Sequence, residues 1–424
     1  MTGVLITDAF FRAAVATPDK LALVCGHDAV SYADLAGRVR RMSVARPRVE
    51  VLADNGIESI VQILATAAAG SEAVILDPSW PAATRVAAIE SLAPSPSPGC
   101  FLIVFTSGTT GVPKAIVRTH ASWIASFAAS AKELGTSSAT SVLAPGPLAH
   151  GLTLYAAVET LAAGGTVRLL PRFDVDACLA ALPSVDTLVA VPTICDLIAA
   201  AAVGPMAHLA RVVTAGAKLS PALRARLATT FPAAEIIEYY GASELSFVTV
   251  AKGDAPPDSV GRAFAGVELA VRDDVVWVKS EMLSLGYLNA PDAAGFRRDG
   301  AWATVCDRGV IDRHGYLRLL GREGDMIVTS GLNVYPTEVE ALIERHPSVL
   351  AAAVFGIDDS RWGQIVAAAV VLQPGAPFDR DALISHCRAH LPSAKTPRRW
   401  FCVPALPMTA SGKVARAQLP ALAR

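Results

Sequence analysis

The chain has 424 residues, of which 52% are hydrophobic and 18% charged, and its formal net charge is −1. This composition excludes a disordered or collagen-like chain, and a nearly neutral chain has no global attraction to nucleic acid or anionic lipid. Because 424 residues exceed what one compact core usually holds, we expect two or three domains.

The apolar segments are too short, or too often interrupted by Pro, Gly and His, to span a membrane. The chain does not start with a basic segment, so no signal peptide is predicted. Its seven Cys are scattered without a CxxC pair, which is typical of a reducing compartment. The eight His show no metal-ligand spacing. We therefore expect a cytoplasmic protein that binds no nucleic acid and does not insert stably into a membrane.

Short apolar runs alternate with stretches of helical period, which is typical of an α/β fold. In chain order, we predict a strand over residues 73–76, a helix over 83–92, strands over 101–105 and 187–191, a helix over 221–230, and β-rich segments over 267–278 and 316–320. A Pro/Ser/Gly connector occupies residues 93–99.

The pattern of predicted strands and helices changes after residues 321–325. A shorter unit of about 100 residues follows, with strands predicted near 351–355 and 366–372 and helices over 336–345 and 379–391. We therefore place a domain boundary at about residue 322. This predicts a large domain over 1–321 and a small α+β domain over 322–424.

A buried strand, Phe101 to Phe105, leads directly into the sequence Thr-Ser-Gly-Thr-Thr-Gly-Val-Pro-Lys of residues 106–114. Glycines allow backbone N–H groups to approach an anion, and Ser/Thr hydroxyls add donors. Lys114 adds a positive charge. Since Pro113 precedes the lysine and Ala115 follows it, this is not a Walker A loop. The alternative is a flexible surface loop, but the preceding strand and the Pro-Lys ending favour a phosphate-binding loop.

Residues 106–114 resemble the signature loop of the adenylate-forming enzymes, a superfamily that includes acyl-CoA synthetases, adenylation domains of nonribosomal peptide synthetases and beetle luciferases. Further segments resemble the motifs of this superfamily in the same order, across nearly the whole chain: 147–151, 214–220, 238–244, Asp307, 321–322 with 330–340, and 406–413. The chain is therefore identified as a member of this superfamily, similar to acyl-CoA synthetases.

The resemblance implies a large AMP-binding domain of β-sheets flanked by helices and a small mobile C-terminal domain that carries the catalytic lysine. The implied catalytic residues are Lys413, Glu244 and His150, with Glu244 and Thr109 on magnesium and a hinge at Arg322, Glu323 and Gly324. The implied nucleotide-binding residues are Thr106, Ser107, Gly108, Thr109, Thr110, Gly111, Lys114, Gly216, Ala217, Lys218, Glu238, Tyr239, Tyr240, Gly241, Ala242, Ser243, Asp307 and Arg322. The candidate acyl pocket consists of His150, Thr153, Thr193, Thr214, Gly241 and Phe247.

Each of these residues also has an ordinary structural interpretation. Glu244 and Lys413 are otherwise solvated charges, Tyr240 a core aromatic, and His150 and Asp307 polar residues of turns. Two alternatives for adenine stay open: Glu238, or the backbone beside it, reads the amino edge of the base while Tyr240 stacks on it.

The chain departs from the superfamily pattern at several positions. Only 105 residues precede Thr106, so the start of the large domain is shortened, and the connector at 93–99 is a candidate place for the loss. Val305 and Cys306 replace the usual Thr-Gly before Asp307, and Gly324 replaces a larger hinge residue. No Phe-Asp-x-Ser segment follows His150, which favours a plain acid over an amino acid.

The sequence thus predicts a ligase that activates a fatty or aromatic acid with ATP and Mg²⁺, releases pyrophosphate, and transfers the acyl group to coenzyme A. One alternative is a stand-alone ligase that loads the phosphopantetheine of a carrier protein in a biosynthetic pathway. Another is a homologue that binds nucleotide without catalysis.

Overall fold

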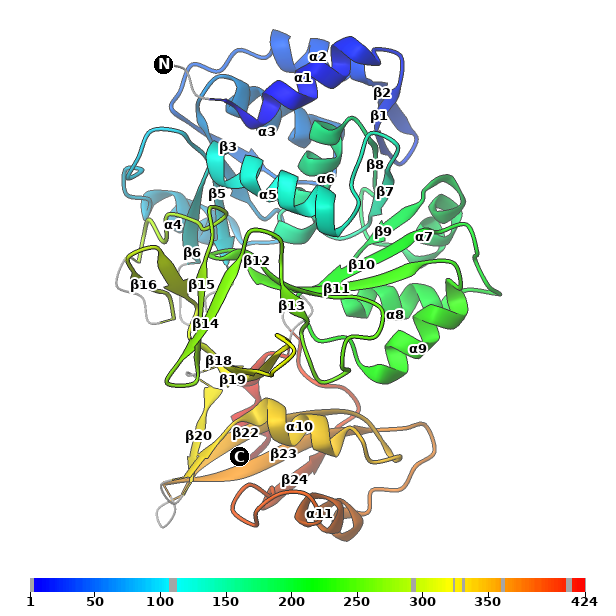
Figure 1. Cartoon of the computed structure of the whole chain (residues 1–424), viewed down its shortest axis with the longest axis vertical. Helices are drawn as coiled ribbons and strands as arrows, with labels where there is room; N and C mark the ends of the chain where they lie inside the picture. The colour runs from blue at the N-terminus through cyan, green and yellow to red at the C-terminus, as the bar shows by residue number, and fades with distance from the viewer. Residues whose placement is uncertain are drawn as a thin grey trace. The chain divides into compact units, whose positions relative to one another are not determined.

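The computed structural model describes residues 4–106, 113–290, 295–322, 325–329, 332–359, 363–408 and 414–423. The chain divides into two compact units, coloured from blue to red along the sequence in Figure 1. Unit 1 comprises Met1–Ala270, Trp277–Val305 and Asp312–Leu317, and unit 2 comprises Val271–Val276, Cys306–Ile311 and Arg318–Arg424. The predicted boundary at residue 322 lies close to Arg318. The sequence did not indicate the two short segments that unit 2 also includes, because they belong to it through contacts between residues distant in the chain.

The largest sheet of unit 1 has nine strands in the order β13-β12-β11-β10-β9-β7-β8-β1-β2. Its six central strands are parallel, whereas β2, β12 and β13 are antiparallel to their neighbours. The strands are β1 (Leu21–Cys25), β2 (Asp28–Ser31), β7 (Ser141–Ala144), β8 (Thr166–Leu169), β9 (Thr187–Val189), β10 (Arg211–Ala215), β11 (Glu235–Ala242), β12 (Ser246–Ala251) and β13 (Arg262–Ala263).

Helices cover both faces of this sheet, as its parallel strands require. One face and the helices around it share a core built from α1 (Ile6–Ala16), α2 (Tyr32–Arg41), α3 (Ile57–Ala68), α5 (His120–Glu133) and α6 (Gly151–Ala163). The opposite face packs against α7 (Val175–Ala181), the 3-10 turn Leu182–Ser184, α8 (Pro192–Ala201) and α9 (Pro221–Thr230). We call these the α6 face and the α9 face.

A second sheet of unit 1 has the order β3-β4-β5-β6. It comprises β3 (Arg48–Leu52), β4 (Glu72–Leu76), β5 (Cys100–Thr106) and β6 (Lys114–Thr119), with α4 (Ala82–Glu90) between β4 and β5. The first three strands are parallel and β6 is antiparallel to β5. The connector at 93–99 lies between α4 and β5.

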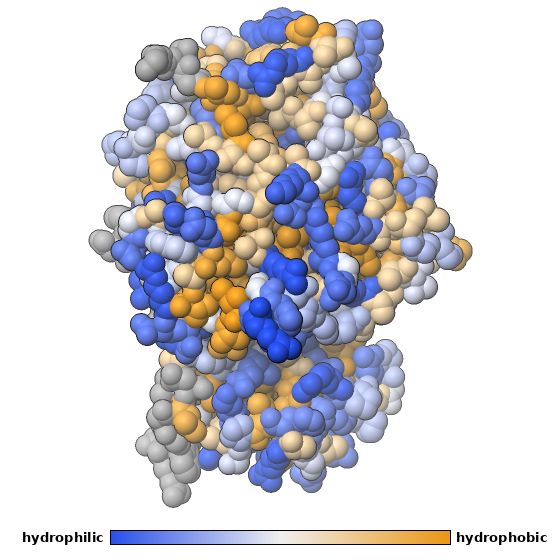
Figure 2. Space-filling view, in the orientation of Figure 1, coloured by the Kyte–Doolittle hydropathy of each residue, from blue (hydrophilic) through white to orange (hydrophobic). Residues whose placement is uncertain are grey.

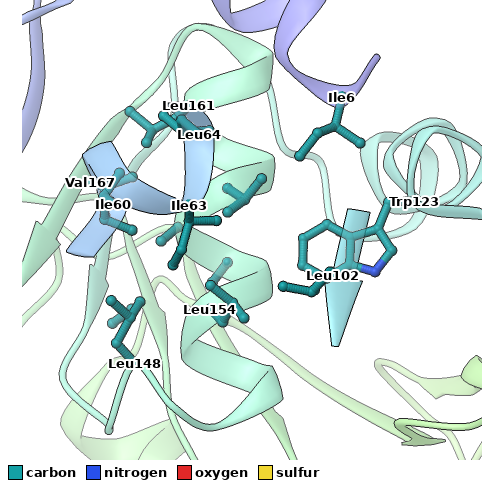
Figure 3. Packing of buried hydrophobic residues seen from close by; sticks show 14 of the residues in the cluster. Ile6, Ile60, Ile63, Leu64, Leu102, Trp123, Leu148, Leu154, Leu161 and Val167 are labelled. Atoms are coloured by element: carbon teal, nitrogen blue, oxygen red, sulfur yellow. The ribbon is translucent and has the colours of Figure 1, made fainter. Parts of the chain in front are cut away.

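Helix α6 passes through the core of unit 1. Leu154 and Leu161 on this helix are fully buried, and Figure 3 shows them among the side chains of Ile60, Ile63 and Leu64. Burying one such side chain stabilises a fold by about 1.5–3 kcal/mol. The helix ends at Gly164, whose φ of 82° is the left-handed conformation that glycine adopts without a steric penalty. This packing holds α6 against the sheet, and it therefore also fixes the position of the residues at the N-terminal end of the helix.

The remaining strands of unit 1 follow the large sheet in the chain. Strand β16 (Arg297–Asp299) pairs with β17 (Trp302–Thr304), and β17 pairs with the Val278–Lys279 end of β15 (Val275–Lys279). Strand β14 (Glu268–Arg272) also pairs with β15.

Unit 2 is an α+β domain. Its sheet has the order β21-β20-β23-β22, and β24 pairs in parallel with β23. Two helices pack on one face of the sheet, and the C-terminal 3-10 helix contributes Leu419 to the other. The elements are β18 (Asp307–Ile311), β19 (Leu317–Arg322), β20 (Ile327–Thr329), β21 (Leu332–Val334), α10 (Pro336–Ile343), β22 (Val349–Asp359), β23 (Gly363–Leu372), α11 (Arg380–Arg388), β24 (Arg399–Cys402) and the 3-10 helix Arg416–Ala423.

The predicted α/β class and the small α+β domain are confirmed. The predicted helix over 221–230 coincides with α9, and the predicted strand over 187–191 ends two residues early because Pro192 begins α8. Hydrophilic residues are spread over both units on the face drawn in Figure 2, with smaller hydrophobic areas between them. None of the helices in the described ranges has the length and hydrophobicity that crossing a membrane requires.

Candidate active site

The two ends of the predicted phosphate loop are neighbours in unit 1. Thr106 at the end of β5 pairs with Lys114 at the start of β6, so residues 107–113 connect two adjacent antiparallel strands. Asn289 fastens the second end, because its side chain accepts from the Ala115 N–H and donates to the Pro113 carbonyl, each at 2.8 Å. Asn289 lies 174 residues from Ala115, so no local pattern in the sequence indicates this contact.

Lys114, Tyr287 and Glu244 form a chain of contacts beside this loop. The Lys114 Nζ lies 5.3 Å from the centre of the Tyr287 ring, in cation–π geometry. The Tyr287 hydroxyl donates a hydrogen bond of 2.5 Å to Glu244 Oε1. The structure therefore brings together two site residues that the sequence predicted, Lys114 and Glu244, through a tyrosine that it did not.

A buried arginine holds the segment that carries Glu244. Arg118 of β6 donates to the carbonyls of Ser243 and Met282, at 2.9 and 2.7 Å. Burial lowers the pKa of Arg118 to about 10, which still leaves the guanidinium protonated near neutral pH. A charged donor to two carbonyls makes stronger hydrogen bonds than a neutral one, so Arg118 fixes the backbone next to Glu244.

Strand β11 ends in a bulge that requires glycine. The pairing of β11 with β12 shifts between Tyr240 and Gly241. A Cβ on Gly241 would lie only 2.3 Å from the Ser246 carbonyl oxygen, so no other residue fits without moving the backbone. Tyr239 and Tyr240 lie in the strand directly before this bulge, both half-buried, and Ala242, Ser243 and Glu244 follow it.

His150 is the residue before the first turn of α6. Its Nε2 lies 3.5 Å from Asp77 Oδ2, and the other oxygen of Asp77 accepts from the backbone and the hydroxyl of Ser79. The buried Asn55 holds the preceding turn, since its side chain donates to the Gly146 carbonyl and accepts from the Leu148 N–H. His150 is thus fixed from two sides at the start of a buried helix.

The start of α6 also lies beside the Glu244 segment. A Cβ on Gly151 would lie 3.8 Å from the Ser243 hydroxyl oxygen. The sequence motifs at 147–151 and 238–244, separated by nearly ninety residues, therefore lie close together in unit 1.

Glu238 is almost fully buried on the α9 face, with 2% of its surface exposed. Its carboxylate accepts from Lys218 Nζ at 2.7 Å, from the Leu219 N–H at 2.8 Å and from Arg224 at 3.0 Å. These bonds anchor the exposed loop of Gly216, Ala217 and Lys218, in which Gly216 has a φ of 92°. Both oxygens of Glu238 are thus engaged by donors within unit 1.

The candidate acyl-pocket residues separate between the two faces of the sheet. The α6 face contains a small cavity of about 20 Å³, and Phe247 is the one candidate among the described residues that line it. Thr214 lies beside Cys195 on the α9 face, Thr153 is buried near Gly146, and Thr193 is exposed. Strand alternation explains the separation, since neighbouring residues of β10 point to opposite faces.

Asp307 and Arg322 form an ion pair of 2.8 Å in unit 2. Cys306, directly before Asp307, has a φ of 62°, the left-handed region that costs a residue with a side chain about 1–2 kcal/mol. The superfamily pattern has glycine at this position, a residue that adopts a positive φ without this cost. The residues Ser107, Gly108, Thr109, Thr110, Gly111, Glu323, Gly324 and Lys413 lie outside the described residues.

The donors around Glu244 suit a magnesium ion bound together with a nucleotide. No group of three or more His, Cys, Asp or Glu side chains in the described ranges could hold a metal by itself. Mg²⁺ is usually held by one or two carboxylates together with phosphate oxygens. Glu244, with the Tyr287 hydroxyl beside it, fits that pattern. Glu244 would therefore hold the ion only when phosphates complete its ligands.

Comparison with known proteins agrees with this geometry. Residues 90–288 match the AMP-binding enzyme family, and residues 338–413 match the AMP-binding enzyme C-terminal domain. A Bacillus subtilis (strain 168) protein named "Uncharacterized acyl--CoA ligase YhfT" is 31% identical over 98% of this chain and 97% of its own length. The 2-succinylbenzoate–CoA ligase of Geobacillus kaustophilus (strain HTA426) is 30% identical over 76% of this chain and 69% of its own.

Among solved structures, ATP-bound MatB from Rhodopseudomonas palustris has a TM-score of 0.86 at 26% identity, and the match covers 99% of both chains. The family matches, the near-complete coverage by relatives and the fold all agree with the resemblance seen in the sequence. The chain belongs to the AMP-binding family of adenylate-forming enzymes, and it is an AMP-forming, acyl-CoA ligase-like enzyme.

Proposed function

We propose that this enzyme activates a plain carboxylic acid, fatty or aromatic, as an acyl-adenylate with release of pyrophosphate, and then transfers the acyl group to the thiol of coenzyme A. The observation that carries the proposal is the chain of contacts Lys114–Tyr287–Glu244 beside the phosphate loop. It combines a cation with a hard oxygen donor, the two kinds of group that binding ATP phosphates requires.

Attack of a carboxylate on the α-phosphate brings two anions together, so oriented positive charge must offset their repulsion. We assign Lys114 to the phosphates, since it lies at the end of the loop that Asn289 fastens. A magnesium ion, when bound, supplies further positive charge to the phosphate oxygens. Tyr287 and Arg118 then keep Glu244 in place to receive it.

His150 at the start of α6 is assigned to the acid. Its imidazole, held by Asp77, lies where a helix N-terminus favours a negatively charged group. Asp307, paired with Arg322, is assigned to the ribose hydroxyls and Lys413 to the attacking carboxylate, both from the resemblance. The 2-succinylbenzoate ligase among the relatives supports an aromatic acid as one class to test.

Acid-dependent exchange of pyrophosphate into ATP tests the first half-reaction, with a panel of fatty and aromatic acids. Thioester formation with coenzyme A, compared with a phosphopantetheinylated carrier protein, tests the second. We expect exchange with at least one acid class and thioester formation with coenzyme A. Exchange followed by transfer only to the carrier protein would contradict the assigned acceptor, and absence of exchange with every acid would contradict the ligase.

Two variants serve as controls for this assay. Lys413→Ala should lower exchange by at least about 100-fold and largely spare thioester formation from a pre-made acyl-adenylate. Glu244→Gln keeps the shape of the side chain and should weaken the use of magnesium-ATP while leaving thermal unfolding unchanged. Equal loss of both half-reactions in Lys413→Ala would contradict the role of that lysine.

A further inference from the structure

The two ends of the loop that includes Lys413 are neighbours in unit 2. Met408 and Val414 form an antiparallel bridge across these ends. The Ala415 N–H donates to the Pro407 carbonyl at 2.7 Å. Lys413 lies outside the described residues, whereas both ends of its loop lie within them. Whatever holds these ends therefore determines where the loop begins and ends on unit 2.

Apolar contacts hold the two ends against the sheet of unit 2. Leu406 before the loop and Val414 after it pack against a buried cluster. This cluster includes Phe355 of β22 and Leu419 of the C-terminal 3-10 helix. Hydrophobic contact is not directional, so it keeps the ends on the sheet without fixing their orientation.

Arg416, the first residue of the 3-10 helix, supplies directional contacts. Its guanidinium donates to both oxygens of Glu340 on α10, at 2.5 and 2.8 Å. It also donates to the Val354 carbonyl of β22 at 2.9 Å, and Glu340 accepts from the Val354 N–H at 2.7 Å. Such a two-pronged pair fixes the orientation of both side chains. Helix α10, strand β22 and the end of the loop are thus joined at one point.

This pair is largely shielded from water. The side chains of Arg416 and Glu340 are 24% and 12% exposed. Burial alone would lower the pKa of Arg416, but the hydrogen bonds and the charge of Glu340 raise it, so the guanidinium stays charged. Because solvent and salt screen a partly buried pair less than an exposed one, the pair holds its geometry under ordinary assay conditions.

Arg416 also contacts the segment that follows the expected hinge. Its Nε lies 3.6 Å from Asp325 Oδ2, and Asp325 comes directly after residues 322–324. The Asp325 side chain is more exposed than that of Glu340, so this contact contributes less. One guanidinium therefore relates the loop of Lys413 to α10, to β22 and to the end of the hinge.

We propose that Arg416, held by Glu340, is a positioning residue for the first half-reaction, because it orients the loop that carries Lys413. This inference rests on the proposed function, which assigns Lys413 to the attacking carboxylate. A displacement of about 1 Å in a reacting group can cost a factor of about 100 in rate. Arg416 acts only through Lys413 and not on the thioester step.

Variants of the pair, measured in both half-reactions, test the proposal. Arg416→Met keeps an apolar stem and removes the guanidinium. With an acid that the wild type accepts, we expect it to lower pyrophosphate exchange at least about tenfold, with thioester formation from a pre-made acyl-adenylate within about threefold of the wild type. Glu340→Gln should show a smaller loss of the same kind. Arg416→Lys should retain part of the exchange, since lysine keeps the charge without the planar fork.

The ion pair between Lys395 and Glu338 is the matched control on the same helix. Lys395 donates to both oxygens of Glu338, at 2.9 and 2.7 Å, from the segment between α11 and β24. Lys395→Met removes a comparable pair from α10 and should leave the ratio of the two half-reactions unchanged. An equal shift of this ratio in Lys395→Met and Arg416→Met would overturn the proposal, because any loosening of α10 would then suffice.

A double variant decides whether Arg416 acts through Lys413. In the Lys413→Ala background, adding Arg416→Met should lower the residual exchange by less than about twofold. A further loss as large as in the wild-type background would overturn the proposal, because Arg416 would then act independently of the lysine. If Arg416→Met does not fold, Glu340→Gln takes its place, and unchanged exchange in that variant would equally overturn the proposal.

The wild type separates this proposal from the proposed function. Exchange by the wild type, together with equal losses of both half-reactions in Arg416→Met, overturns the role of Arg416 and leaves the ligase standing. Absence of exchange with every acid overturns both.

Discussion

The two faces of the large sheet in unit 1 each bury a glutamate, but they treat it differently. On the α9 face, Glu238 accepts from Lys218, Arg224 and the Leu219 N–H, and it anchors a loop. On the α6 face, Glu159 has an oxygen with no partner among the described residues and lines a cavity. The charge of the first carboxylate is compensated by two cations, whereas the second has only hydroxyls beside it and lines a small cavity.

The reason for the difference lies in what packs against each face. Helix α9 and the loop before it contribute cations next to Glu238, so its charge is compensated. Around Glu159 the neighbours are aromatic rings and hydroxyls, and burial therefore favours the protonated form. Four predictions test this comparison, from the largest expected effect to the smallest.

Removal of Glu238 should give the largest effect. Glu238→Ala leaves Lys218 and Arg224 beside a buried space without a counter-charge. Breaking a buried ion pair costs about 3–5 kcal/mol, and we expect about 2–3 kcal/mol here because both cations are partly exposed and can be hydrated. Denaturant unfolding measures this loss.

The exposed pair between Arg38 and Glu58 provides the control for this measurement. Glu58→Ala should change the free energy of unfolding by at most about 0.5 kcal/mol, since both side chains are well hydrated. Equal losses in Glu238→Ala and Glu58→Ala would show that Glu238 is not a structural anchor.

The pH dependence of stability should reveal the unpaired carboxyl. The folded protein holds the Glu159 proton up to a pKa of about 8, whereas the unfolded chain releases it near 4.5. Stability contributed by this proton is therefore present at low pH and lost as pH rises from about 5 to 8. The titratable side chains of Tyr155 and Tyr239, whose pKa burial raises, and the charged Arg211 line the same cavity.

Glu159→Gln removes this titration. Relative to the wild type, the variant should gain unfolding free energy steadily as the pH rises from about 5 to about 8. Glu344 in unit 2, whose pKa burial raises to about 7, titrates in both proteins and cancels in the difference. Parallel stability profiles for the two proteins would contradict a protonated Glu159.

The Tyr155 hydroxyl should contribute about 1 kcal/mol through its bond to Ser126. A double-mutant cycle of Tyr155→Phe and Ser126→Ala isolates this contact by denaturant unfolding. We expect Tyr155→Phe to cost less in the Ser126→Ala background than in the wild type. Strict additivity of the two substitutions would mean that the hydroxyl has another role, and would weaken the contrast with Glu159.

Thr214→Val should have the smallest effect, a change between zero and a gain of about 1 kcal/mol. Its buried hydroxyl lies beside the Cys195 thiol, a weak hydrogen-bonding group, and has no stronger partner within the described ranges, so its removal costs little. Thr249 is the matched control, because it is equally buried in a strand but donates to the Val260 carbonyl at 2.5 Å. Thr249→Val should cost about 1 kcal/mol. A similar loss in both variants would show that Thr214 has an unrecognised partner.

Much of the fold followed from local patterns. The alternation of apolar runs with helical periods predicted the α/β class and the positions of strands such as β5 and helices such as α9. The motifs also named Lys114 and Glu244, which both contact Tyr287. The same motifs contain Gly216 and Gly241, whose conformation or close contacts a side chain would disturb.

The partners of these residues could not be predicted. Tyr287 lies 43 residues from Glu244 along the chain, and Asn289 lies 174 residues from Ala115. Asp77 and Arg118 are likewise brought to the site by other strands. No local periodicity encodes such contacts, because they depend on the order in which strands assemble into a sheet.

The sequence by itself determined the kind of chemistry, through motifs whose residue types and order match adenylate-forming enzymes. Only the tertiary structure decided which face of the sheet each side chain occupies. Thr214 and Val213 are adjacent in β10, yet the first lies beside Cys195 on the α9 face and the second lines the cavity of Glu159. The physical reason is that a strand alternates its side chains with a period of two, so the pairing register, fixed by the whole sheet, assigns each residue to one core or the other.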